Sequence, residues 1–227
     1  MTDEQRTVFC FGDSNTHGTR ALRFLGDQRR HPKGARWPDV MAEMLGSGWD
    51  VIAEGHPGRT TVLDDPIEGN HRNGVRVLRA LLESHRPIDL VIIMLGTNDL
   101  KARFGMAAAD VALGEQRLMV EVSTAACGPG GATPDILIAA PVRVTETGVF
   151  TEIFAGAQEK ADALPGHLRH LAERHGVGFV DCNEVARVDP NDGVHLDARA
   201  HLSIGQLITG AVLDHLKKKG TEHAQGN

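Results

Sequence analysis

The sequence predicts an α/β protein in which helices cover both faces of a parallel sheet. Five short apolar runs stand out, and each is too short for a helix and is rich in Val, Ile or Phe or continuously apolar. Such runs are typical of strands buried on both faces. Longer stretches with helical spacing of apolar residues lie between them, and this alternation repeats five times. No linker, repeat or low-complexity segment divides the 227 residues, so we expect one domain over residues 1–227.

The expected strands follow one another in the order 7–11, 50–53, 90–95, 136–140 and 177–180. The first clear helix lies between the first two strands. There, apolar residues recur at positions i, i+3, i+4, i+7 and i+8 from Trp37 to Leu45, and Gly46 follows as a stop. The remaining helices have the same character and are expected over 75–84, 109–125, 154–174 and 198–219.

The bulk composition is that of an ordinary globular protein, with 41% hydrophobic and 24% charged residues and a formal net charge of -6. This charge argues against a nucleic-acid surface, which needs clustered Lys and Arg. No run of 18 apolar residues predicts a membrane span, and residues 1–6 lack the basic-then-apolar order of a signal peptide. Cys10, Cys127 and Cys182 have no CxxC spacing, so we expect reduced, mostly buried thiols and a cytoplasmic protein.

The residues that follow the strands are the informative ones, because ligands of such sheets bind beyond the carboxyl ends of the strands. Ser14 follows the first strand within VFCFGDSNTHG, Gly58 follows the second and Asn98 follows the third. Asp192 and His195 come after the fifth strand, within DGVH. A hydroxyl, amide donors and an Asp/His pair are therefore expected on one rim of the sheet.

These residues are the parts that an acyl-transfer site needs. A serine that attacks a carbonyl gives its proton to a neighbouring base, and His195 is the candidate base for Ser14. A carboxylate such as Asp192 holds the imidazole in the required tautomer and stabilises the imidazolium. The negative oxygen of the tetrahedral intermediate needs preorganised N–H donors. The Gly58 backbone and the Asn98 carboxamide can supply them, with the Ser14 backbone as a third donor if Ser14 opens a helix.

Four blocks stand in order along the chain: Gly12-Asp13-Ser14, Gly58, Gly96-Thr97-Asn98-Asp99 and Asp192-Gly193-Val194-His195. Together they resemble the marker blocks of the SGNH hydrolases, also called GDSL-like esterases. The strings CFGDS, DDP, LVIIMLGTND and DGVHLD are more similar to the bacterial arylesterase/acyltransferase branch of that family. The resemblance extends from about residue 8 to residue 216.

The resemblance implies a three-layer α/β/α sandwich with a five-stranded parallel sheet, the flavodoxin-like SGNH hydrolase fold. It implies that Ser14 is the nucleophile, His195 the base and Asp192 its carboxylate partner. It also implies an oxyanion hole formed by the N–H groups of Ser14 and Gly58 and the side chain of Asn98. Members of this branch cleave short-chain acyl esters, often aryl esters. Some transfer the acyl group to alcohols or peroxide, and some assemble as octamers.

From this resemblance we expect a small-molecule ester with an acetyl-type acyl group as the substrate. We expect no metal and no organic cofactor, no nucleic-acid or membrane partner, and a homo-oligomer. Twelve histidines invite a metal interpretation, but the chain has no HExxH and the histidine spacings do not gather a ligand set. Asp13 and Asp99 are expected to pin loops by accepting backbone N–H bonds, with Arg59 paired to one of them.

The chain departs from the branch pattern directly after the serine. Branch members tend to carry a hydrophobic residue there and a Trp three places after the serine, where this chain has Asn15 and His17. If both side chains face the substrate, the pocket is more polar and less suited to acyl transfer in water. His56 also lies near the expected site. Loops 62–73 and 142–153 are expected to act as lids over the pocket or as oligomer contacts.

Two alternatives stay open at the level of sequence. The same Ser-His-Asp set would serve a carbohydrate O-deacetylase, which the polar Asn15 and His17 favour slightly. A non-enzymatic flavodoxin-like module could instead bind a phosphate or nucleotide at the turn after the first strand. GDSNTHG, however, lacks both GxGxxG and a GK[ST] ending.

Overall fold

Five parallel strands form one sheet in the order β2-β1-β3-β4-β5. The computed structural model describes the backbone of residues 5–225 and the side chains of residues 5–215, so residues 1–4 and 226–227 of the expected domain lie outside the described residues. The strands are β1 Arg6–Gly12, β2 Trp49–Gly55, β3 Leu90–Met94, β4 Asp135–Ala140 and β5 Gly178–Asp181. Each overlaps one of the five expected strands.

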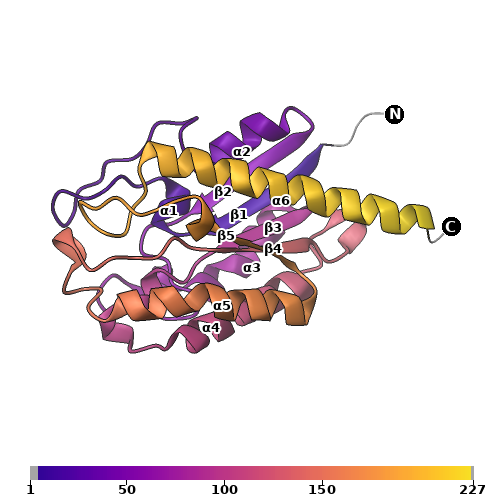
Figure 1. Cartoon of the computed structure of the whole chain (residues 1–227). Coiled ribbons are helices and arrows are strands. Elements are labelled where there is room, and N and C mark those ends of the chain that lie inside the picture. The colour runs from indigo at the N-terminus through magenta and orange to yellow at the C-terminus, as the bar shows by residue number, and fades with distance from the viewer. Residues whose placement is uncertain (1–4, 226–227) are drawn as a thin grey trace.

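The helices form two layers, one on each face of the sheet (Figure 1). Helices α2 (Trp37–Leu45) and α6 (Ala198–Gln225) cover one face, while α3 (Gly74–His85), α4 (Ala108–Thr124) and α5 (Ala157–His175) cover the other. Successive residues of a strand therefore enter different cores: Val8 packs toward α2 and α6, and Phe9 packs toward α3 and α4. This arrangement confirms the predicted three-layer α/β/α fold.

The start of α5 and the end of α6 differ from the boundaries expected from the sequence. The helix expected over 154–174 begins at Ala157, because Gly156 directly before it adopts a left-handed conformation with φ 74°. Phe154, at the expected start, is instead a buried core residue in a turn. The last helix begins at the expected Ala198 and continues past the expected end to Gln225.

Two glycines at the ends of neighbouring strands allow the short helix α1 (Ser14–His17) to lie across the sheet edge. Gly12 of β1 and Gly55 of β2 are paired in register. A Cβ on Gly55 would lie 2.1 Å from the backbone nitrogen of His17, and a Cβ on Gly12 would lie 2.0 Å from Thr16 Oγ1. Glycine is therefore required for this close approach, which fixes Ser14 at the rim. None of the described helices is long and apolar enough to cross a membrane.

We predict that Gly55→Ala lowers the free energy of unfolding by about 1–3 kcal/mol, because the new methyl group overlaps the α1 backbone. The matched control is Gly166→Ala in the exposed middle of α5, where an added Cβ meets nothing within 4 Å. That change should raise the free energy by about 0.5–1 kcal/mol. Urea denaturation of both variants measures the difference, and equal stability of the two would contradict the tight α1–β2 contact.

Candidate active site

A cavity of about 760 Å³ opens at the carboxyl ends of the strands. Ser14, Gly58, Asn98 and His195 all line it, although they come from four different segments of the chain. Sequence reasoning placed these residues on one rim, and the structure brings them around one cavity. A second, larger cavity of about 960 Å³ lies beside it and is lined by neither Ser14 nor His195.

His195 and Asp192 form a buried pair. The distance from His195 Nδ1 to Asp192 Oδ2 is 2.6 Å, and the two residues are 4% and 0% exposed. The other carboxylate oxygen, Oδ1, accepts the backbone N–H groups of Val194 and His195 at 3.0 Å each. The Asx-type turn formed by DGVH therefore holds the carboxylate against the ring.

Asp192 remains ionised near neutral pH. Burial alone would raise its pKa, but the His195 ring and the converging backbone N–H groups outweigh burial and hold the pKa below its ordinary value. Because an ionised carboxylate only accepts hydrogen bonds, His195 must donate through Nδ1–H. Its Nε2 is then the nitrogen that is free to accept a proton.

Ser14 occupies the first position of α1, where Asp13 caps the helix. The Asp13 carboxylate accepts the backbone N–H of Asn15 at 2.9 Å. Within the described residues, no hydrogen bond joins the Ser14 hydroxyl to His195, although both side chains line the same cavity. Such bonds are commonly long in free enzymes and shorten when substrate binds.

Asn98 and Gly58 present N–H donors beside Ser14. The Asn98 amide nitrogen donates to the backbone oxygen of Arg59 at 3.1 Å and to Asp13 Oδ2 at 3.3 Å. Both partners are acceptors, which fixes the nitrogen of the carboxamide on this side. Gly58 lines the same cavity, and its φ of +75° with Glu68 and Arg72 packed close by leaves no room for a side chain.

Comparison with known proteins places the chain in a family. The model of the GDSL-like lipase/acylhydrolase family matches residues 10–203. The chain belongs to this family of SGNH hydrolases. It is a carboxylic ester hydrolase, and the alternative of a phosphate- or nucleotide-binding module is therefore wrong.

Solved structures similar to the chain cover nearly all of it. An inhibitor-bound aryl esterase from M. smegmatis is 34% identical, with a TM-score of 0.87 over 92% of this chain and 99% of that one. Est24, a carbohydrate acetylesterase from Sinorhizobium meliloti, is 37% identical, with a TM-score of 0.88 over 92% and 99%. Another carbohydrate acetylesterase family member from Sinorhizobium meliloti is 40% identical, with a TM-score of 0.85 over 92% and 97%. A search of curated proteins found no match.

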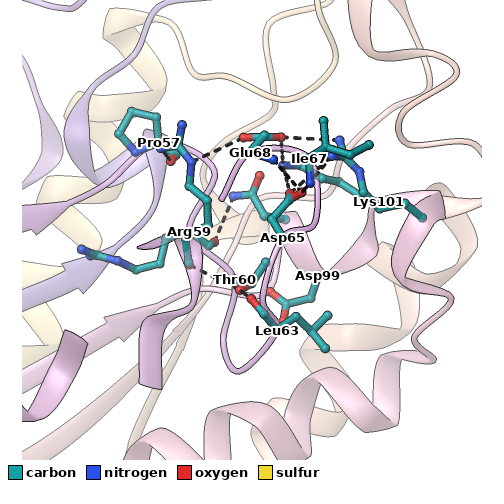
Figure 2. Close-up of polar contacts among 12 residues, drawn as sticks. Pro57, Arg59, Thr60, Leu63, Asp65, Ile67, Glu68, Asp99 and Lys101 are labelled. Atoms are coloured by element: carbon teal, nitrogen blue, oxygen red, sulfur yellow. Dashed lines mark hydrogen bonds and ion pairs between the residues drawn. The ribbon is translucent and has the colours of Figure 1, made fainter. Parts of the chain in front are cut away.

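One wall of the cavity of this hydrolase is charged. Glu68 and Lys101 line it and form an ion pair with 2.5 Å between Lys101 Nζ and Glu68 Oε1. Asp65 lies 3.6 Å from the same ammonium group (Figure 2). This cluster is next to the oxyanion candidate, because a Cβ on Gly58 would lie 2.6 Å from Glu68 Oε2.

Another part of the cavity wall is apolar. Phe150 packs beside His195 with 5.7 Å between the ring centroids and a tilt of 51°. The other apolar side chains on the cavity are Leu22, Leu25, Pro57, Ile153, Phe154 and Val194. The imidazole thus faces a site suited to an apolar or aromatic group.

The three expected substrate-lining residues are placed differently in the structure. His17 lines the cavity, whereas Asn15 and His56 do not. Asn15 is buried and donates through Nδ2 to the backbone oxygen of Val194 at 3.1 Å, so it ties α1 to the His195 segment. His56 packs edge-on against His71 with a centroid distance of 5.5 Å. Burial, with the neighbouring Arg59 and Arg72, lowers the pKa of His56 to about 4.

The expected structural roles of Asp13 and Asp99 agree with their contacts, but the expected pairing of Arg59 is wrong. Asp99 accepts the Thr61 backbone N–H at 3.0 Å and its hydroxyl at 2.5 Å. Arg59 donates to the backbone oxygens of Gly12 and Glu54 instead of pairing with an aspartate. Its guanidinium also lies 4.2 Å from the centroid of the Phe11 ring.

Sequence reasoning missed the largest contributor to the cavity, the segment between α1 and α2. Residues 19–30 supply much of one side, including Leu22, Leu25 and Arg30. They have no apolar period from which a pattern could be read. The available signal was length, because long loops without secondary structure in compact domains are usually functional or disordered. Loops 62–73 and 142–153 do contribute to the cavity, through Glu68 and Phe150 among others.

Helix α4 carries a buried acid, Glu115, whose charge interacts with that of Asp99. Glu115 is 0% exposed, and a backbone hydrogen bond from Leu95 offsets the effect of its burial only in part. Burial, and secondarily the charge of Asp99, raises the pKa of Glu115 to about 8. Asp99 is itself affected, since burial raises its pKa to about 6. We found no group of three or more His, Cys, Asp or Glu side chains in the described residues that could hold a metal ion.

We predict that Glu115 makes the protein less stable as pH rises. The unfolded chain loses this proton near pH 4.5 and the folded chain near pH 8, so the folded state binds more protons between these values. The free energy of unfolding should then fall by up to ~5 kcal/mol across this range. Urea denaturation at several pH values should show that Glu115→Gln removes this fall.

The control is Glu121→Gln on the same helix, where the carboxylate pairs with Arg79 and Arg117. Since these partners lower the pKa of Glu121 against the effect of burial, its titration lies below the tested range. A Glu115→Gln variant that keeps the wild-type pH dependence would contradict the assignment.

Proposed function

We propose that the chain is a serine esterase that hydrolyses short-chain, acetyl-type carboxylic esters, chiefly aryl esters, through Ser14, His195 and Asp192. The observation that carries the proposal is the buried His195–Asp192 pair with a 2.6 Å contact, placed on the same cavity as Ser14. A nucleophile, a base and an orienting carboxylate are the parts of a Ser-His-Asp triad.

In the acylation step, Ser14 Oγ attacks the ester carbonyl while its proton passes to His195 Nε2. The carbonyl oxygen becomes negative and is stabilised by the N–H groups of Ser14 and Gly58 and by the Asn98 amide. To reach this oxygen, Asn98 redirects one N–H from Asp13, the longer of its two bonds at 3.3 Å. Asp192 stabilises the imidazolium that forms.

In the second half of the step, the C–O bond of the ester breaks and His195 gives its proton to the leaving alcohol. The acyl group remains on Ser14. Water then gives a proton to His195 Nε2 and attacks the acyl-enzyme, and collapse of the second intermediate returns the proton to Ser14 and releases the acid. An alcohol or peroxide in place of water would give acyl transfer or perhydrolysis.

The preference for aryl esters is supported by the wall beside the base. The leaving group must lie next to His195 to receive its proton, and Phe150 packs against that ring. An aromatic alcohol would contact Phe150 in an arrangement that aromatic pairs favour. The similar M. smegmatis protein is an aryl esterase. The proposal keeps the predicted homo-oligomeric state and cytoplasmic location.

We predict that Ser14→Ala lowers kcat for p-nitrophenyl acetate by at least about 10⁴-fold, because no other group can form the acyl-enzyme. The variant should also lose covalent labelling by a fluorophosphonate, as measured by intact-protein mass. Ser123→Ala is the matched control, since that hydroxyl donates to Met119 within α4, away from the cavity. A folded Ser14→Ala protein that retains activity would exclude the proposed nucleophile.

Carbohydrate O-deacetylation is the second candidate, and the charged wall favours it. Glu68, Arg72 and Lys101 offer hydrogen-bonding groups on the cavity that an aryl acetate would not use. Two similar structures are carbohydrate acetylesterases or members of that group. Acetylated sugars would be cleaved by the same chemistry, with the sugar as the leaving alcohol.

A substrate panel of aryl acetates and acetylated monosaccharides separates the two candidates. We predict a higher kcat/KM for aryl acetates, and a decrease of about 10-fold in that value for Phe150→Ala with little change for ethyl acetate. If acetylated sugars give the higher kcat/KM and Phe150→Ala leaves aryl acetates unaffected, the deacetylase assignment replaces the arylesterase assignment.

A further inference from the structure

Loop 19–30 separates the two large cavities. Its ends are joined by an antiparallel bridge between Thr19 and Arg30. Leu22, the fourth residue of the loop, lines both the catalytic cavity and the larger cavity beside it. The loop therefore forms the partition between the two cavities.

The partition also makes a direct contact with the catalytic pair. The backbone N–H of Leu22 donates to Asp192 Oδ2 at 2.8 Å. The same oxygen accepts His195 Nδ1 at 2.6 Å. Both contacts are shielded from solvent, since Asp192 is 0% exposed. We propose that loop 19–30 is a clamp that positions the catalytic carboxylate through the Leu22 N–H, an inference that rests on the proposed function of the triad.

An ionic hub inside the loop keeps this N–H in place. Asp27 is 9% exposed and accepts the side chains of Arg23 and Arg29. It also accepts the backbone N–H groups of the same two residues. Arg29 in turn donates to the backbone oxygen of Ala21 at 2.7 Å. The peptide that carries the Leu22 N–H is thus bonded through its own carbonyl group to the hub.

The far end of the loop is anchored to the segment that carries the base. His31 Nε2 lies 3.0 Å from the backbone oxygen of Leu196, which directly follows His195. The His31 backbone N–H donates to the oxygen of Gly18 at 2.8 Å, beside α1. His31, directly after the loop, is therefore hydrogen-bonded both to the end of α1 and to the base segment.

The physical role of the Leu22 N–H follows from the shared oxygen. A carboxylate held only by His195 and its own turn could rotate about its last side-chain torsion, which is broad for aspartate. The Leu22 N–H fixes Oδ2 in line with His195 Nδ1 and also helps to keep the pKa of Asp192 low. Loss of this donor should misplace the imidazole in the transition state and leave substrate binding largely intact.

The test compares Leu22→Pro, which removes the N–H, with Leu22→Ala, which keeps it and shortens the side chain. We expect Leu22→Pro to lower kcat for p-nitrophenyl acetate roughly 10- to 100-fold with KM changed by less than about threefold, the effect of losing one hydrogen bond to a charged group. Both variants alter a side chain that lines the cavity, so the comparison isolates the N–H, and kcat of Leu22→Ala should exceed that of Leu22→Pro by at least about fivefold. Equal kcat in the two variants would overturn the clamp.

A second pair of variants covers the case in which Leu22→Pro does not fold. Asp27→Asn weakens the hub and should lower kcat about 5- to 10-fold, at nearly unchanged KM, while one fluorophosphonate still binds per chain. Glu121→Gln also neutralises a carboxylate held by two arginines but lies on α4 and should keep wild-type kcat. Wild-type kcat in Asp27→Asn would overturn the clamp, whereas activity in Ser14→Ala would overturn the triad itself.

Discussion

The carboxylate of Asp192 is the point on which the rest of the site depends, because four N–H groups converge on its two oxygens. Oδ2 accepts hydrogen bonds from His195 Nδ1 and the Leu22 backbone N–H, and Oδ1 accepts them from the backbone N–H groups of Val194 and His195. Ionisation of this buried group, with its lowered pKa, sets the tautomer of the imidazole. The nitrogen that faces the cavity is free to take a proton only while this arrangement holds.

Close contacts that only glycine permits place Ser14 on the same cavity as His195. Gly12 and Gly55 end two paired strands, and α1 occupies the space that their side chains would fill. Because α1 carries Ser14 and is capped by Asp13, the serine is fixed relative to the sheet. The same Asp13 contacts Asn98, so Ser14 and the Asn98 carboxamide share one anchor. Substrate specificity would then depend on the cavity lining, which is apolar around Phe150 and charged around Glu68.

Short sequence patterns were enough to predict the strands and the polar residues that follow them. Buried parallel strands are continuously apolar, and the marker residues follow them directly. The sheet and the placement of Ser14, Gly58, Asn98 and His195 around one cavity could therefore be predicted. The direction in which each side chain points could not be predicted from the sequence. Asn15 adjoins the serine in sequence, but its carboxamide turns to the Val194 carbonyl. Loop 19–30 has no periodicity, and its contact with Asp192 depends on tertiary hydrogen bonds between residues 170 positions apart.

A crystal structure of the covalent adduct with a small phosphonate tests the proposed nucleophile and oxyanion hole most directly, because the adduct resembles the tetrahedral intermediate. We expect phosphorus bonded to Ser14 Oγ, with one phosphonyl oxygen within about 2.7–3.1 Å of the Gly58 backbone nitrogen and the Asn98 amide nitrogen. His195 should keep its contact with Asp192. An adduct on another residue, or a phosphonyl oxygen directed toward Lys101 and away from Gly58 and Asn98, would contradict the proposed site.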